Sequence, residues 1–422
     1  MSTLPSTLER RVFAWNISWA VLGNISASLL QWLILIIIAK FGDTLSMGQY
    51  AVSLAWVAPL TVFSSLQLRS VQATDARNQF SISDFFTLRC LTSAVALTII
   101  CGFALIGRHS DTPPALMILI GLSRLIDGMS DVFYGCLQKY ASMRIVARSL
   151  LIRGVTQCGV VLIALYCFRS MLLAALAMVA VSVCVTFLHD SLSAQRTAAH
   201  YGQAFSNSDL ISLGRIRPLL SLTFPLGVAS GINSFRGNIS RYVVAYVLGT
   251  KSVGVFSALV YPNFGILTAT AAVGQALSPK FGAHAASGMQ SDFNRFVMQV
   301  VTISAALAFL TSVVCCFWAP QILSVAYNHA MASFTGVFCC LLAALPFACA
   351  ASFLNDALVA RRRMHQQVTL FLSVGLVEGL VALALVWRLG LMGVAIATLI
   401  AAGVQTALAS YQVFKARPNC QI

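Results

Sequence analysis

Residues 123–140 read SRLIDGMSDVFYGCLQKY and directly follow the apolar run PPALMILIGL of residues 113–122. The apolar run predicts a helix that crosses a membrane, yet its continuation carries three charges, Arg124, Asp127 and Asp131. A charged side chain that faces lipid near the bilayer centre costs about 2.5–3.5 kcal/mol. We therefore expect this part of the helix to face protein or a water-filled cavity.

The composition supports a membrane protein. Of the 422 residues, 59% are hydrophobic and only 9% are charged, whereas soluble domains carry about 25% charged residues. The formal net charge of +15 is attributed to basic loops on the cytoplasmic side, and no nucleic-acid partner is expected.

The sequence indicates no catalytic or metal site. The 12 cysteines have no CxxC spacing and lie mostly in apolar runs, so they are interpreted as small buried hydrophobic residues. Neither a nucleophile elbow nor a phosphate-binding loop is found. We expect a protein that is not an enzyme, with no cofactor beyond a possible coupling ion, H⁺ or Na⁺.

Twelve apolar segments are long enough to span a membrane, which takes roughly 20 residues. They cover approximately residues 14–39, 48–68, 87–107, 114–138, 148–168, 171–189, 219–240, 253–277, 297–318, 332–355, 367–387 and 391–413. With both termini in the cytoplasm, roughly 19 Lys and Arg residues lie inside against roughly 6 outside, which favours this orientation. In that count Arg69, Arg89 and Arg153 are taken as residues of the cytoplasmic segments.

The chain divides into two halves of six spans. The longest loop separates residues 1–189 and 219–422, predicted as two six-helix bundles, with residues 190–218 as a cytoplasmic linker. Residues 39–59 and 246–262 share a pattern of two glycines and a proline, near the start of each half. This echo favours an internal duplication, typical of alternating-access transporters, over generic Gly-rich hairpin chemistry.

The charges of the fourth span share one helix face. At about 100° per residue, Arg124, Asp127, Asp131, Tyr134 and Gln138 fall within an arc of about 80°. One interpretation is a local ion pair between Arg124 and Asp127, with Asp131 hydrogen-bonded to a neighbouring helix. The other is a polar cavity or a charged partner on another helix.

Polar residues also mark three other spans. In the seventh, Asn233 and Arg236 share a face, and Arg236 either binds an anion or bridges to Asp131 or Glu378. In the first, Asn24 and Gln31 belong to a neutral stripe. Glu378 stands alone in the eleventh span and is either an ion carrier or a counter-ion for an arginine.

Several of these segments resemble the bacterial oligosaccharide flippases, which include O-antigen flippases and belong to the multidrug/oligosaccharidyl-lipid/polysaccharide exporter superfamily. Residues 22–42, LGNISASLLQWLILIIIAKFG, resemble the first helix of that family. The fourth-to-fifth-helix region resembles it at Tyr134, Gly135, Gln138, Ser149, Arg153 and Gly154.

The resemblance implies an all-α fold with two six-helix bundles around a central cavity, in the bacterial inner membrane. It implies a flippase that moves undecaprenyl-diphosphate-linked oligosaccharide to the periplasmic leaflet for surface polysaccharide, including lipopolysaccharide. Arg124 and Arg236 are then candidates for the diphosphate, with Asn24, Gln31, Tyr134, Gln138 and Asn233 as further substrate contacts. Asp127, Asp131 and Glu378 are the ion-coupling candidates.

Membrane lipids, a glycan polymerase and a chain-length regulator are the other partners that the resemblance suggests. A multidrug exporter of the same superfamily is the alternative, although such exporters usually carry acids in the cavity. A membrane-embedded glycan polymerase or ligase is also considered, but it usually needs a large external loop. A scaffold of a glycan-assembly complex would leave the polar stripes unexplained.

Overall fold

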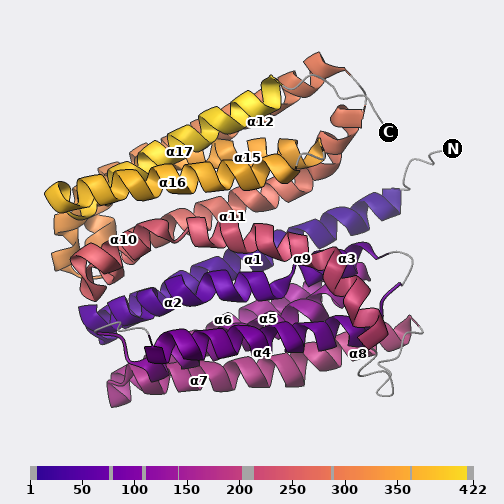
Figure 1. Cartoon of the computed structure of the whole chain (residues 1–422), viewed down its shortest axis with the longest axis horizontal. Coiled ribbons are helices and arrows are strands. Elements are labelled where there is room, and N and C mark those ends of the chain that lie inside the picture. The colour runs from indigo at the N-terminus through magenta and orange to yellow at the C-terminus, as the bar shows by residue number, and fades with distance from the viewer. Residues whose placement is uncertain are drawn as a thin grey trace. The chain divides into compact units, whose positions relative to one another are not determined.

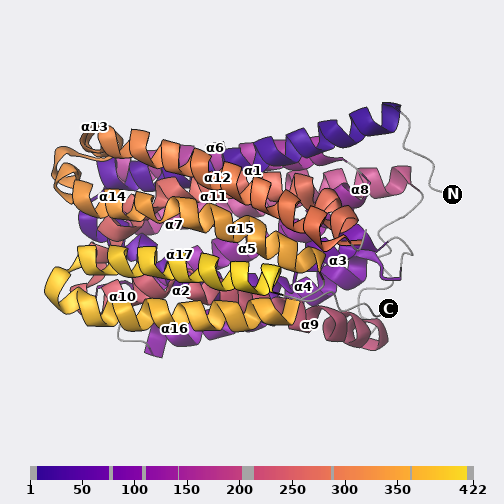
Figure 2. The same cartoon turned by 90° about the horizontal axis from the view of Figure 1, so that it is seen from above.

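The computed structural model describes residues 7–75, 79–106, 111–140, 142–201, 213–286, 289–361 and 364–415. Within these ranges all regular secondary structure is helical (Figures 1 and 2). The chain forms two compact units, Met1–Ser234 and Phe235–Ile422. The predicted all-α membrane fold is confirmed.

The helices of the amino-terminal unit run largely side by side (Figure 1). They are α1 (Thr7–Phe41), α2 (Thr44–Ser65), α3 (Leu68–Thr74), α4 (Ile82–Ile106), α5 (Pro114–Lys139), α6 (Met143–Phe168), α7 (Met171–Cys184), the π-helical turn η1 (Val185–Asp190), α8 (Ser191–His200) and α9 (Leu213–Arg236), which ends in the second unit.

The carboxy-terminal unit holds the remaining helices, among which α16 and α17 form a close hairpin (Figure 2). They are α10 (Ile239–Leu248), α11 (Thr250–Ala286), α12 (Gln290–Phe317), α13 (Ala319–Ala326), the 3₁₀ turn η3 (His329–Phe334), α14 (Thr335–Ala343), α15 (Leu345–Ala360), α16 (Met364–Leu389) and α17 (Leu391–Phe414).

Ten segments of the described chain are long and apolar enough to cross a membrane, and they coincide with ten of the twelve predicted spans. The fourth predicted span is α5, which is 26 residues long but carries the charges of the polar stripe. The seventh, 219–240, is interrupted because α9 ends at Arg236 and α10 begins at Ile239. A single continuous helix across this segment, assumed in the face analysis of the seventh span, is therefore wrong.

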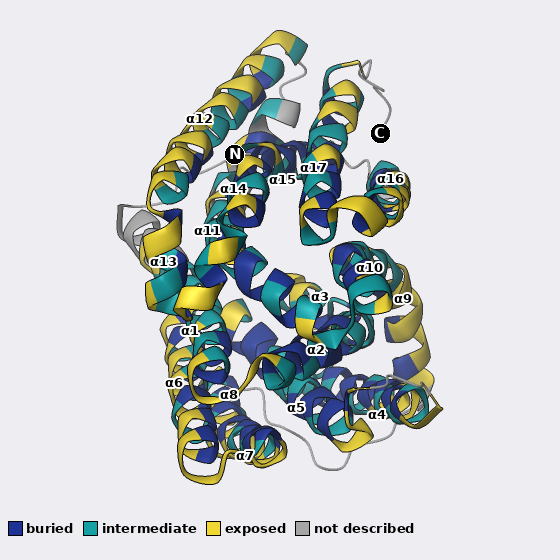
Figure 3. Ribbon diagram, turned by 90° about the vertical axis from the view of Figure 1, so that its left-hand side faces the viewer, coloured by how far each residue is buried: buried dark blue, intermediate teal, exposed yellow. Residues whose placement is uncertain are grey.

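The stripe-bearing helix lies inside its unit. Helix α5 packs against α2, α3, α4, α7 and α8, and most of its second half is buried. In contrast, helices such as α12 expose apolar side chains along their length (Figure 3). An apolar outer surface suits contact with lipid, whereas Arg124, Asp127 and Asp131 of α5 line a cavity within the unit.

Candidate functional site

A cavity of about 470 Å³ lies within the amino-terminal unit, between helices α1 to α6. Its lining combines hydroxyl and amide side chains with six charged residues, four of them basic. The charged lining residues are Arg69, Arg89, Arg124, Asp127, Asp131 and Arg153. We call this cavity the arginine pocket. Its size falls in the range of small-molecule sites, about 300–1,000 Å³.

A break between α2 and α3 brings Arg69 to this pocket. Leu66 and Gln67 adopt left-handed backbone conformations, with φ of 47° and 54°, so the chain turns sharply before α3. The Nε of Arg69 donates a hydrogen bond to Gln138 at 3.2 Å. Its guanidinium lies 3.8 Å from the Asp131 carboxylate and 5.5 Å from the centre of the Tyr134 ring. One arginine thus contacts three of the five stripe residues.

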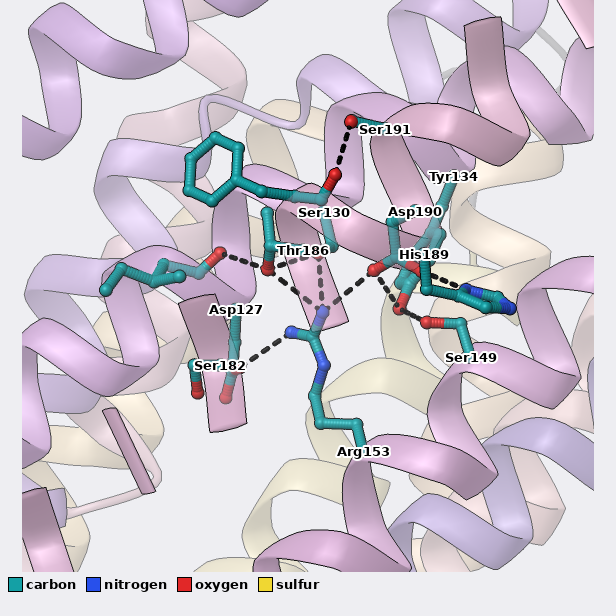
Figure 4. A network of polar contacts seen from close by, with 12 residues as sticks. Asp127, Ser130, Tyr134, Ser149, Arg153, Ser182, Thr186, His189, Asp190 and Ser191 are labelled. Carbon is teal, nitrogen blue, oxygen red and sulfur yellow. Dashed lines mark hydrogen bonds and ion pairs between the residues drawn. The ribbon is translucent and has the colours of Figure 1, made fainter. Parts of the chain in front are cut away.

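A second arginine, Arg153 on α6, is the centre of a buried polar network (Figure 4). It donates to Asp127 on α5 at 2.6 Å and to Asp190 at 2.8 Å. It also donates to the hydroxyls of Ser130 at 2.6 Å and Thr186 at 3.1 Å. Asp127 therefore has its partner on another helix, and the stripe's acids are balanced by arginines of α3 and α6.

The π-helical turn η1 supplies the other side of this network. It contains both Thr186 and Asp190, and such turns are frequent at functional sites. The hydroxyls of Tyr134 and Ser149 are 2.7 Å apart, and Tyr134 also donates to Asp190 at 3.2 Å. His189 Nδ1 lies 2.9 Å from the same carboxylate. Four of the motif residues quoted above, Tyr134, Gly135, Ser149 and Arg153, are buried.

Arg124 lines the pocket, with one guanidinium nitrogen 3.5 Å from the hydroxyl of Tyr50. Gln31 lines the same pocket, but Asn24 does not. Asn233 is exposed and belongs to the amino-terminal unit, while Arg236 belongs to the second unit. The roles of these residues in binding stay predictions.

Sequence reasoning missed Arg89. The topology count placed it in a cytoplasmic segment, but it lies within α4, is 2% exposed and lines the arginine pocket. Arg69 and Arg153, counted in the same way, line the pocket too. The topology rule counts a basic residue near a helix end whether its side chain faces water or the protein interior. The rule alone therefore could not distinguish a loop arginine from a pocket arginine. In the structure Gly128 faces Arg89 from the stripe-bearing helix, a proximity that depends on tertiary packing.

The carboxy-terminal unit has a smaller cavity, of about 150 Å³, lined by both Arg236 and Glu378. Arg236 donates to Gln405 at 3.3 Å and lies over the Phe371 ring at 5.4 Å. Glu378 accepts a hydrogen bond from Ser240 at 2.6 Å. No ion pair within 4 Å joins Glu378 to Arg236 in the described part of the chain, so the ion-carrier and counter-ion interpretations of Glu378 both stay predictions.

No cluster of His, Cys, Asp or Glu that could hold a metal ion is found among the described residues. The donors and acceptors of the two cavities are instead guanidinium, amide, hydroxyl and carboxylate groups. Such groups suit the binding of a polar, anionic molecule, because arginine matches phosphate and carboxylate oxygens in pairs of hydrogen bonds.

Residues 13–284 match the family model described as "Polysaccharide biosynthesis protein". The capsular polysaccharide biosynthesis protein CapF of Staphylococcus aureus is 22% identical over 403 residues, covering 95% of this chain and 99% of CapF. The structure is similar to that of the lipid II flippase MurJ in an inward closed conformation, with a TM-score of 0.74, 15% identity, and coverage of 93% of this chain and 86% of MurJ. It is also similar to an inward-facing multidrug resistance MATE transporter, with a TM-score of 0.70, 14% identity, and coverage of 94% and 96%.

Proposed function

Because the chain belongs to the polysaccharide biosynthesis protein family, we propose that it is a flippase for undecaprenyl-diphosphate-linked oligosaccharide. It moves the glycan headgroup from the cytoplasmic to the periplasmic leaflet of a bacterial inner membrane, by alternating access. The product feeds surface polysaccharide assembly, where a polymerase and a chain-length regulator are the partner proteins. The chain itself catalyses no bond-breaking step.

The arginine pocket is the observation that carries this proposal. Four arginines and two aspartates line a cavity inside a membrane-spanning unit, so the lining has an excess of positive charge. Burying charges in a membrane protein is costly, and intramembrane ionisable residues mark substrate or ion pathways by default. A diphosphate headgroup is the anionic cargo for which such a lining is suited, while the polyprenyl tail stays in lipid.

Ion coupling is proposed to involve Asp131 in preference to Asp127. Asp127 is held by Arg153 at 2.6 Å, with 17% of its side chain exposed. Asp131 is 3.8 Å from Arg69, with 43% of its side chain exposed, so an H⁺ or Na⁺ reaches it more readily. Export that responds to the proton and sodium gradients equally in the wild type and in an Asp131→Asn chain would contradict this assignment.

The test of the function is a deletion strain with a leaflet-resolved assay of lipid-linked glycan. We expect the glycan to accumulate on the cytoplasmic leaflet and to return to the periplasmic leaflet when the gene is restored. A normal outward distribution in the deletion strain would refute the flippase function.

A cation-coupled multidrug exporter is the second candidate, supported by the MATE-like fold and by the two aspartates of the pocket. Drug-resistance profiling of the same deletion strain separates the two functions. Hypersensitivity to cationic drugs with normal polysaccharide export would favour the exporter. The membrane-embedded polymerase is less well supported, because positive charge dominates the lining of the arginine pocket.

A further inference from the structure

Arg89 is a buried cation that has no acid in salt-bridge contact among the described residues. It is 2% exposed, and within the described part of the chain its Nε and Nη1 have no hydrogen-bond partner. The two acids that line the same pocket are Asp127 and Asp131, and they pair with Arg153 at 2.6 Å and with Arg69 at 3.8 Å. A buried charge without a partner destabilises a fold, so an arginine kept in this setting calls for an anion that the protein chain itself does not supply.

Gly128 determines where this guanidinium lies. A Cβ atom added at Gly128 would overlap the end of the Arg89 side chain, so the guanidinium rests directly on the backbone of α5. Gly121 and Gly135 stand seven residues away on either side, on nearly the same helix face. A Cβ atom at Gly121 would meet only apolar atoms of Ile100 and Val57, the nearest at 3.1 Å. Gly128 alone among these three faces Arg89.

Arg89 differs from two neighbouring arginines of the pocket in its contacts with acids. Arg153 is held by Asp127 and Asp190, and Arg69 is held by Asp131 and Gln138. These two arginines are thus already engaged by acids. Thr61, Ser65, Gln67 and Ser70 also line the pocket, but each of them already donates a hydrogen bond within the chain.

We propose that Arg89 is the residue of the arginine pocket that holds a phosphate or diphosphate group, and that Gly128 is the positioning residue that sets its guanidinium. Arg124, the pocket arginine chosen from sequence, is then an accessory contact. The proposal rests on the proposed function for the source of the diphosphate, a lipid headgroup, but the site itself is defined by this chain's own contacts.

The test measures binding to the purified full chain in detergent by isothermal titration calorimetry, with inorganic diphosphate and undecaprenyl diphosphate as the two probes. We expect Arg89→Gln and Gly128→Ala to weaken binding at least about tenfold, and Arg89→Lys to weaken it less. Gly121→Ala is the matched control, with the same change on the same helix face, and we expect its affinity to stay within about twofold of wild type. Binding of the lipid form alone identifies a headgroup site, and equal binding of both probes identifies a site for the phosphate groups themselves.

A double variant distinguishes positioning from general damage to the fold. If Gly128 acts through Arg89, adding Gly128→Ala to Arg89→Gln causes no further loss of affinity. If Gly128→Ala lowers the affinity equally in the wild-type chain and in the Arg89→Gln chain, the positioning role is overturned. Wild-type affinity of Arg89→Gln for both probes would overturn the anion-holding role. Because the overlapping atoms belong to the end of a flexible side chain, Gly128→Ala is expected to fold, and size-exclusion chromatography checks this.

Failure of this proposal is separable from failure of the proposed function. If the chain exports glycan but binds diphosphate without using Arg89, the proposed site is refuted and the flippase function stands. If the chain binds diphosphate through Arg89 but the deletion strain distributes its lipid-linked glycan normally, the flippase function is refuted and the proposed site stands.

Discussion

The guanidinium of Arg153 on α6 lies 2.6 Å from the carboxylate of Asp127 on α5. The same guanidinium reaches Asp190 at 2.8 Å, in the π-helical turn that follows α7. One buried cation thus joins three helical segments of the amino-terminal unit, and the charges of residues 123–140 become part of its interior. Because removal of a single partner leaves buried charge uncompensated, the network is sensitive to mutation.

Arg153→Ala is predicted to destabilise the amino-terminal unit by about 3–5 kcal/mol, because it leaves Asp127 and Asp190 without their cation. The measurement is the thermal unfolding midpoint of the detergent-purified protein. Arg148→Ala is the control, since Arg148 is an exposed arginine of the same helix. Equal midpoints for the two variants would contradict the structural role of Arg153.

Asp127→Asn and Asp131→Asn are predicted to differ in stability, although both remove one charge from α5. Asp127 loses a short, largely buried contact with Arg153, which costs about 1–3 kcal/mol. Asp131 loses a longer contact with a side chain that is 43% exposed, which costs at most about 1 kcal/mol. Chemical denaturation of the two variants measures the difference, and a larger loss for Asp131→Asn would be inconsistent with these contacts.

Gly154→Ala is predicted to destabilise the protein by about 1–3 kcal/mol, because α1 and α6 pack closely at this position. An added Cβ atom would press against the side chain of Leu30. Gly159→Ala serves as the control on the same helix, since nothing lies within 4 Å of the position its Cβ would take. There the change is predicted to be neutral or to stabilise by up to about 1 kcal/mol, because alanine favours helix more than glycine. Thermal midpoints of the two variants test this contrast.

Arg236→Ala is predicted to reduce polysaccharide export strongly, and Arg236→Lys less so. Lysine keeps the charge but loses the planar group that lies over Phe371 and reaches Gln405. Export is measured in a deletion strain that carries each variant, with protein levels compared by immunoblot. Arg388→Ala, which removes an exposed arginine of the same unit, should leave export unchanged. Wild-type export by a stably expressed Arg236→Ala chain would exclude a role of Arg236 in binding the anion.

The sequence was sufficient to predict the membrane-spanning character, the stripe on α5 and its orientation toward protein. These follow from hydropathy, helix periodicity and the cost of exposing charge to lipid. It could not identify the partners of the stripe, because Arg69, Arg153 and Asp190 come from other helices and their meeting depends on tertiary packing. The break between Arg236 and Ile239 was missed because the seventh span was assigned by its overall length, although the sequence at the break, Arg-Gly-Asn, is polar. Arg89 was missed because its place near a helix end satisfied the topology rule.

The central claim, that the chain flips a diphosphate-linked glycan, is tested most directly in liposomes that contain only the purified protein and undecaprenyl-diphosphate-linked oligosaccharide. A glycan-modifying enzyme added outside the liposomes acts only on glycan in the outer leaflet. Glycan that becomes modified after this initial fraction has moved from the inner leaflet. We predict that glycan of the inner leaflet becomes accessible at a rate that rises with protein content and falls in the Arg89→Gln variant. A rate equal to that of protein-free liposomes would contradict the account.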